Sequence, residues 1–285
     1  NAIAYVLFGN NSPLLYYIDL NQMSPTEGIK FNRPILDDNS DFRVSTAGDF
    51  NNDGFDDIIV SSNRSDIAAD NSGAIYVIYG NNSLASDAIN LDDINGSNGL
   101  AIQGTVPSDH AGSSVSHAGD FNGDQRDDIL IGSDGDSSEP GDNSYGHVYL
   151  VFGSDNPSHP LLLSSINGSN GVKFIGESAS AFAGTGIAGN FDFNADGLDD
   201  IIIGSHGARP YNNYNAGKAY VVYGNDAVIS SPFSVDSIDG SNGTEIRGLN
   251  AKGRFGRAVS GIGDFNGDHI DDIIVGAPAS DSTGW

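Results

Sequence analysis

The sequence has 285 residues, a formal net charge of −26 at pH 7 and no cysteine. The lack of cysteine excludes disulfides, thiolate metal sites and a cysteine nucleophile. Because only 12 Lys and Arg stand against 38 Asp and Glu, we expect neither nucleic acid nor an anionic membrane as a partner. There is no signal peptide and no apolar run long enough to span a bilayer, so we expect a mature soluble chain or an excised piece, without membrane insertion.

The first predicted element is a strand at 1–9, an apolar and β-branched run that contains Tyr5 and ends in Gly9. After it, four kinds of segment return in the same order at intervals of 71 or 72 residues. They are a run of small residues, an acidic loop that continues into an apolar strand, a strand containing Tyr, and a strand after a turn rich in Asn and Gly. Such regular spacing predicts a repeat architecture.

Each repeat supplies four strands, and no segment has the periodicity of a helix. Four-stranded units at a fixed period are typical of β-propeller blades, so we expect an all-β propeller of antiparallel blades, with residues 1–285 as one domain of four repeats. The last repeat stops before its Tyr strand, and the chain opens with one. We therefore expect the N-terminal strand to complete the last blade and close a ring. A segment of a larger ring, and completion of a neighbouring molecule's blade, are the alternatives.

The acidic loops are the candidate sites. They begin at Asp49, Asp120, Asp192 and Asp264, and each reads Asp-x-Asn-x-Asp-x-x-Asp-Asp. Carboxylates packed this closely repel by about 1 kcal/mol per pair in bulk water, and by about 4 kcal/mol at an effective dielectric of about 20. Calcium removes that penalty, because it is bound by several oxygen ligands from flexible loops. An acidic turn whose Asp and Asn serve only turn geometry is the alternative, and four matching copies favour the ion.

An EF-hand has a similar spacing, but it needs a Glu at loop position 12 and helices on both sides. Position 12 holds Val60, Ile131, Ile203 and Val275, and the flanks are predicted strands, so the EF-hand is excluded. We expect the side chains at positions 1, 3, 5 and 9 and the carbonyl of position 7 to surround each ion, with up to four Ca²⁺ bound. The predicted ligands are Asp49, Asn51, Asp53, Phe55 and Asp57; Asp120, Asn122, Asp124, Arg126 and Asp128; Asp192, Asn194, Asp196, Leu198 and Asp200; and Asp264, Asn266, Asp268, Ile270 and Asp272.

In the last copy, Phe255-Gly256 precedes the loop and Gly276-Ala277-Pro278 follows it. With these residues, the chain resembles FG-GAP repeats, the blades of integrin α-subunit propellers and of many large bacterial surface proteins. The resemblance spans nearly the whole chain, although the other three copies keep the ion loop without both flanking signatures. It implies a propeller with Ca²⁺ loops between the first and second strands of the blades. It does not imply a particular ligand.

The copies differ at loop position 6, where a sharp turn often needs a positive φ angle. Loops one and three have Gly54 and Gly197 there, whereas loops two and four have Gln125 and His269. Because His tolerates this conformation better than most residues, we expect loop four to bind an ion and loop two to be the weakest. Two extra residues at 190–191 are expected to bulge the strand that enters loop three.

No catalytic arrangement is evident, and we expect no enzyme activity. The six His are scattered, with His110 and His117 as the one close pair, and no Ser/His/Asp order is present. Catalytic metals usually keep a coordination position open for substrate, whereas each predicted ion here takes its ligands from one loop. The ions are therefore expected to be structural.

Recognition is the expected role. Connections in an antiparallel blade alternate between two faces, so the loops between second and third strands, at 63–72, 134–145 and 206–216, should lie opposite the ion loops. The last one holds Arg209, Tyr211 and Tyr214, residue types that are common at interfaces.

We expect an extracellular, Ca²⁺-stabilised module for adhesion or for binding a protein or glycan, because extracellular Ca²⁺ suits the weak sites of extracellular modules. A self-assembling structural subunit joined by strand exchange, and a non-catalytic domain of a larger secreted enzyme, are the alternatives.

Overall fold

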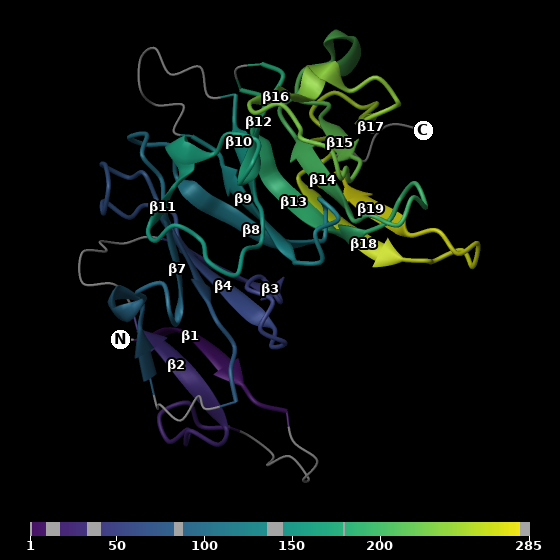
Figure 1. The fold of residues 1–285 in the computed structure, drawn as a ribbon. Helices are drawn as coiled ribbons and strands as arrows, with labels where there is room; N and C mark the ends of the chain where they lie inside the picture. Colours follow the sequence, from purple (N-terminus) through teal and green to yellow (C-terminus); the bar gives the residue numbers. More distant parts are fainter. Residues whose placement is uncertain are drawn as a thin grey trace.

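The computed structural model describes residues 2–9, 18–32, 41–82, 88–135, 145–178 and 180–279. These residues form β-strands and short 3-10 helices, without an α-helix among them (Figure 1). Within the same residues, no helix is long and apolar enough to cross a membrane. The strands are β1 (Ala2–Leu7), β2 (Gly28–Asn32), β3 (Phe42–Gly48), β4 (Asp57–Ser62), β5 (Ala74–Ile78), β6 (Ala88–Asn90), β7 (Gly99–Gln103), β8 (Ala111–Gly119), β9 (Asp128–Ser133), β10 (His147–Val151), β11 (Leu161–Leu162), β12 (Gly171–Ile175), β13 (Ala183–Phe191), β14 (Asp200–Ser205), β15 (Lys218–Val222), β16 (Phe233–Ser234), β17 (Gly243–Arg247), β18 (Ala258–Gly263) and β19 (Asp272–Gly276).

Three complete blades follow one another along the chain. Their strand orders are β3-β4-β5-β7, β8-β9-β10-β12 and β13-β14-β15-β17, with antiparallel neighbours throughout. All six residues of β9 and all six of β14 are buried, which explains why these strands read as continuous apolar and small residues. The predicted four-stranded antiparallel blades are confirmed.

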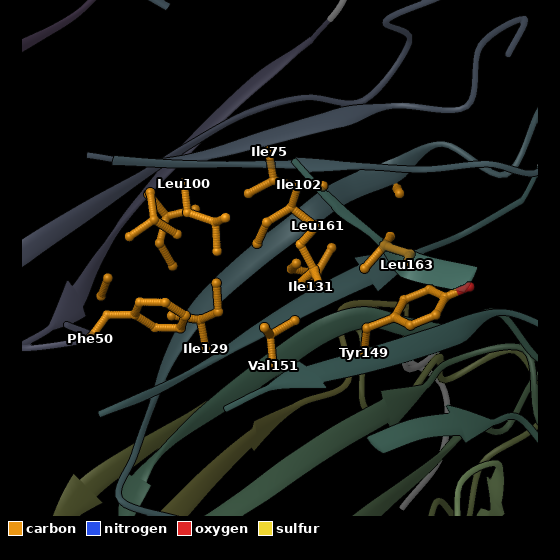
Figure 2. Close-up of a cluster of buried hydrophobic side chains, with 14 of the residues drawn as sticks. Phe50, Ile75, Leu100, Ile102, Ile129, Ile131, Tyr149, Val151, Leu161 and Leu163 are labelled. Atoms are coloured by element: carbon orange, nitrogen blue, oxygen red, sulfur yellow. The ribbon is translucent and has the colours of Figure 1, made fainter. Parts of the chain in front are cut away.

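The hydrophobic cores lie between consecutive blades. One of them joins Ile75, Leu100 and Ile102 of the first complete blade to Ile129 and Val151 of the second (Figure 2). A second core joins the second and third complete blades in the same way. The first strands, β3, β8, β13 and β18, lie next to one another, so their small residues allow neighbouring sheets to come close. Each complete blade therefore buries apolar side chains against the blade next to it.

Short strands that the sequence analysis did not predict connect neighbouring repeats. After the Tyr strand, the chain adds a short parallel strand to the outer edge of the preceding blade: β6 pairs with β2, β11 with β7, and β16 with β12. A 3-10 helix follows each one, at Leu91–Asp93, Leu163–Ser165 and Val235–Ser237. These pairings cover part of each outer edge.

The predicted closure by the N-terminal strand is wrong. Strand β1 pairs with β2, a strand that the sequence analysis missed, whereas β18 and β19 form a separate two-stranded sheet. In Figure 1 these two pairs lie at opposite ends of an arc of blades. The reason is that the two pairs pack on different blades: β18–β19 contacts the third complete blade, whereas β1–β2 packs on β4 and β5 of the first. Strands β1 and β2 correspond to the third and fourth strands of a blade and form the outer half of a further one.

Candidate metal centres

Each acidic loop joins the first two strands of a blade. The four loops connect β3 to β4, β8 to β9, β13 to β14, and β18 to β19. The first strand enters each loop through an irregular register, such as that between His117 and Gly119 in the second copy. The insertion at 190–191 gives the third copy a register shift between Ala188 and Phe191, as predicted. Since all four loops follow a first strand, they lie at the same end of their blades.

The side chains at positions 1, 3 and 5 meet in every loop. In the first copy, the Asp49 carboxylate accepts hydrogen bonds from the N–H groups of Asp53 and Gly54, both at 2.9 Å. Asn51 also contacts Asp53, through its Oδ1 to the Asp53 N–H at 3.0 Å and through its Nδ2 to the Asp53 carboxylate at 2.9 Å. The same bonds to the position 1 carboxylate recur in the other three loops. The predicted ligand positions thus share one small loop.

The position 9 carboxylates stand at the base of the loops. Asp57, Asp128 and Asp200 are fully buried, and each accepts a hydrogen bond at 2.8 Å from a glycine N–H after the Tyr strand of its own blade. Burial, with a smaller contribution from repulsion by Asp53 and Asp49, raises the pKa of Asp57 to about 7. Burial likewise raises the pKa of Asp200 to about 6. The fold therefore holds carboxylates where a negative charge is unfavourable without a nearby cation.

The residues fit a hard cation. Among the described residues, the Oδ2 atom of Asp57 is buried without a hydrogen bond of ordinary geometry, whereas its counterparts Asp128 and Asp200 accept a main-chain N–H from their own loops. Two further carboxylates lie close enough to raise the pKa of Asp57. The same part of the chain contains no ready cage of three or more His, Cys, Asp or Glu side chains. The three carboxylates predicted for each loop are therefore not arranged as a metal cage, and those at position 1 accept hydrogen bonds from their own loop instead. The predicted set, with its amide and main-chain carbonyl, contains only oxygen donors. Such an all-oxygen set suits Ca²⁺.

The backbone of the loops is more uniform than the sequence indicated. Position 6 has a positive φ in all four copies, at 88° in Gly54, 67° in Gln125, 90° in Gly197 and 70° in His269. Position 4 also has a positive φ in all four, in Asn52, Gly123, Ala195 and Gly267. Each loop therefore places one glycine and one non-glycine residue in the left-handed region. Loop two was expected to bind its ion most weakly because Gln125 stands at position 6. Since every loop has one non-glycine residue with a positive φ, this conformational reason does not distinguish loop two from the others.

Sequence analysis missed the role of position 8. The Asp127 carboxylate in loop two accepts a hydrogen bond at 2.7 Å from the N–H of Asp49, the first residue of loop one. Asp199 and Asp271 do the same to the first residues of loops two and three, at 2.8 and 3.1 Å. We call this contact the loop clasp. In loops two, three and four, the first Asp of the Asp-Asp pair therefore hydrogen-bonds to the preceding loop, whereas the second is a predicted ligand of its own loop.

The predicted ligand face lies at the opposite end of the blades. Strand β14 begins directly after loop three and ends at Ser205, where the connection to β15 begins. Tyr211 and Tyr214 are 65% and 53% exposed in that connection. The Arg209 guanidinium lies 4.7 Å from the ring centre of Tyr214, so the two predicted side chains stack. The corresponding connection at 134–145 falls largely outside the described residues.

The two close histidines do not form a joint site. His110 precedes β8 and lies 3.5 Å from a carboxylate oxygen of Asp134. His117 lies near the other end of β8, and its Nε2 atom is 3.0 Å from the carboxylate of Asp127 in the loop clasp. Both therefore contact neighbouring structural residues.

Comparison with known families agrees with this geometry. A family model described as FG-GAP repeat matches residues 43–78, 111–151, 183–222 and 255–284. The chain belongs to the FG-GAP repeat family. Each matched range begins at or next to the first strand of a repeat and includes its acidic loop. The four repeats inferred from the spacing are thus the four FG-GAP repeats.

Relatives of this FG-GAP chain include integrin alpha proteins and a phospholipase D. It is 42% identical to integrin alpha-2 of Mus musculus over 94 residues, which cover 33% of the chain and 7% of the integrin. It is 29% identical to integrin alpha-5 of Xenopus laevis over 167 residues, covering 56% and 13%. It is 33% identical to phosphatidylinositol-glycan-specific phospholipase D of Rattus norvegicus over 93 residues, covering 33% and 11%. The chain therefore matches only a small part of each of these relatives.

Proposed function

We propose that this FG-GAP chain is an extracellular, Ca²⁺-stabilised propeller module for adhesion or ligand recognition, with residues 1–285 as one domain and up to four structural ions. The observation that supports the ions is the full burial of the position 9 carboxylates Asp57, Asp128 and Asp200, each close to the carboxylates at positions 1 and 5 of its own loop. A bound cation supplies the opposite charge that these carboxylates lack. The chain's own residues then hold the hairpin between the first two strands, because positions 1 to 9 span that connection.

The ion proposal is tested by calorimetric titration of the chelator-stripped chain with Ca²⁺, together with melting curves in Ca²⁺ and in EDTA. We expect heat of binding and a higher melting temperature in Ca²⁺. A chain that takes up no metal and melts at the same temperature in both conditions would contradict the proposal.

The proposed ligand face is the connection between β14 and β15, with Arg209, Tyr211 and Tyr214. These side chains are exposed and ordered by stacking, and they lie away from the ion loops. We expect a protein or glycan partner there. Replacing both tyrosines with Ala should weaken binding on a glycan or cell-surface array, and unchanged binding would refute this assignment.

The module is proposed to be non-catalytic, even though one relative is a phospholipase by name. The ions lie in loops that also hold the fold, and His110 and His117 contact structural carboxylates. Within a larger secreted enzyme, the repeats would serve the same binding role. Turnover of a lipid or ester substrate by this chain alone would overturn the proposal.

The two half-blades favour a second candidate function, which is assembly of copies through strand exchange. Strands β1–β2 supply the third and fourth strands of a blade, and β18–β19 supply the first and second. Phe265 in loop four is 82% exposed, whereas its counterparts Phe50 and Phe121 are fully buried against the next blade. Mass photometry of this chain in Ca²⁺ should then show head-to-tail multimers that Phe265→Ser disrupts. A monomer at all concentrations would exclude this candidate.

A further inference from the structure

The cations of this acidic chain are gathered at one place. Six of its 12 Lys and Arg lie between residues 209 and 257, at the end of the third complete blade that faces away from the ion loops. Five of them are exposed, and we call these five the basic face: Arg209, Arg247, Lys252, Arg254 and Arg257. Sequence analysis counted the positive charges over the whole chain, because the sequence does not show which residues of different strands and loops lie close together.

Most of these charges have no acidic partner among the residues that the structure describes. The sixth cation, Lys218, forms ion pairs with Glu177 and Glu245, and Arg247 also pairs with Glu245. Among the ion pairs of the described residues, none involves Lys252, Arg254 or Arg257. In a protein of net charge −26, three exposed cations on one short segment without an acidic partner in the described part of the chain are an unusual feature.

The basic face is held on a defined framework. The N–H of Lys252 donates to the Tyr214 carbonyl at 2.7 Å, and the N–H of Arg254 donates to the Asn215 carbonyl at 3.0 Å. The Asn213 side chain donates to the Leu249 carbonyl at 3.0 Å. These bonds fasten the segment before β18 to the connection that carries the exposed tyrosines. The Arg247 guanidinium also lies 5.4 Å from the ring centre of Tyr211, so cations and aromatic rings alternate on one surface.

The fold does not require cations at these positions. Lys252 and Arg254 have φ angles of 63° and 54°. At the same places in the two preceding repeats, Ser108 and Ser180 have 57° and 65°, and His110 and Phe182 have 53° and 52°. Arg257 likewise corresponds to Ser113 and Thr185. The backbone is therefore common to the repeats, whereas the positive charges are specific to this one boundary.

Arg257 also extends the basic face towards the junction of the blades. It lines a cavity of about 430 Å³ together with Arg43 of β3, Ser114 of β8 and Thr185 of β13. Because β3, β8, β13 and β18 lie next to one another, this cavity opens where the first strands converge. Asp134 is the acidic residue in its lining. The basic face thus extends from the loop that holds Arg209 to the cavity that Arg257 lines.

We propose that the basic face binds an acidic glycan, a linear polysaccharide bearing sulfate or carboxylate groups. This inference rests on the proposed recognition role of the same face and adds the chemical class of the ligand. A face of exposed cations beside tyrosine rings suits a narrow, flexible chain that presents an anion on each sugar and a ring face to the aromatics. An acidic protein would bring a broad surface that also meets Glu177, Glu245 and the rest of an acidic molecule, which repels it.

Binding of fluorescent heparin to the Ca²⁺-loaded chain tests the proposal, with poly-L-glutamate and neutral dextran as comparison probes. The decisive variant combines Lys252→Ser, Arg254→Phe and Arg257→Thr, which installs the residues of the preceding repeat on the same backbone. We expect heparin affinity to fall by about tenfold or more if each exposed contact contributes about 0.5–1 kcal/mol. Lys30→Gln in β2 removes one positive charge away from the basic face and should leave affinity unchanged. Arg257→Thr alone provides the same test if the triple variant is poorly folded.

Heparin binding that weakens with NaCl, exceeds binding of poly-L-glutamate, and falls in the triple variant but not in Lys30→Gln would support the proposal. It would be overturned if the Ca²⁺-loaded wild type did not bind heparin at low salt, if the triple variant bound as tightly as wild type, or if poly-L-glutamate bound equally well. Ca²⁺ uptake is measured on the same preparation. A chain that takes up Ca²⁺ and does not bind heparin would contradict this inference alone, whereas a chain without Ca²⁺ uptake would contradict the proposed ion role.

Discussion

The Asp127 carboxylate accepts a hydrogen bond from the main-chain N–H of Asp49 across the boundary between two blades, at 2.7 Å. The N–H of Asp127 also donates to the Asp49 carbonyl at 3.4 Å, so the two residues are joined twice. His117 lies beside the same carboxylate and, through its hydrogen bond, lowers the pKa of Asp127. The clasp therefore ties the first residue of one ion loop to the body of the next blade.

Asp127→Ala should lower the free energy of unfolding by about 1.5–3 kcal/mol, because it removes a charge-assisted hydrogen bond from a partly buried main-chain donor. Urea unfolding in saturating Ca²⁺ measures the change. Asp56→Ala is the matched control, since Asp56 has the same loop position but is exposed and forms no loop clasp among the described residues. Equal losses in both variants would show that the clasp contributes nothing specific.

Gly119→Ala should destabilise the chain by roughly 2 kcal/mol or more, because two costs combine. Gly119 has a φ of +69°, and a Cβ there would lie 2.3 Å from the carboxylate carbon of Asp199. The added methyl group would push Asp199 away from the N–H of Asp120, which it now binds at 2.8 Å. Thermal unfolding compares this variant with Gly9→Ala, whose new methyl group meets nothing within 4 Å. A Gly119→Ala protein as stable as Gly9→Ala would contradict the role assigned to this glycine.

Asp57→Asn should separate ion binding from folding. The amide keeps an oxygen that can accept the Gly80 N–H and removes a charge that burial and two neighbouring carboxylates oppose. In EDTA near neutral pH we expect its melting temperature to equal or exceed that of wild type. In Ca²⁺ it should lose the stabilisation of one site, which is about 2.7 kcal/mol when free Ca²⁺ is about 100 times the dissociation constant. An unchanged Ca²⁺ increment would mean that Asp57 is not a ligand.

Stability should fall with acidification partly through His206. Burial, and then the charges of Arg257 and Arg254, lower the pKa of His206 to about 4 from an ordinary value of 6.5. The folded state therefore favours neutral His206, so its contribution is complete above pH 6.5 and is lost progressively as the pH falls towards 4. Urea unfolding of wild type and His206→Asn at pH 7 and pH 5, in saturating Ca²⁺, isolates this effect from the carboxylates. The free-energy difference between the two proteins should be smaller at pH 5, and an unchanged difference would contradict the assignment.

The spacing of Asp49, Asp120, Asp192 and Asp264 was enough to predict the repeats, the four strands of each blade and the place of the acidic loops. These features are local, since each depends on residues close together in the sequence. The pairing of β1 with β2 was missed because Gly28–Asn32 lacks the Asn-Gly turn that marks the same strand elsewhere. Because β2 was not recognised, the N-terminal strand was left without a partner of its own and was assigned to the last blade.

The candidate site was predictable only within one repeat. Positions 1, 3 and 5 meet as expected, because they are neighbours in one loop. The role of Asp127 and the meeting of Arg209 with Tyr214 depend on how strands and loops are brought together, and no local pattern encodes that. One signal was present: all four loops end in two adjacent Asp, although the predicted ligand set used only the second.

The loop clasp also gives the row of blades a direction. Each clasp runs from position 8 of one loop back to position 1 of the loop before it, so an ion that orders a later loop also steadies the entrance of its predecessor. Calcium sites coupled in this way would fill cooperatively, with a Hill coefficient above one, and chelation would spread from neighbour to neighbour as in a one-dimensional Ising chain.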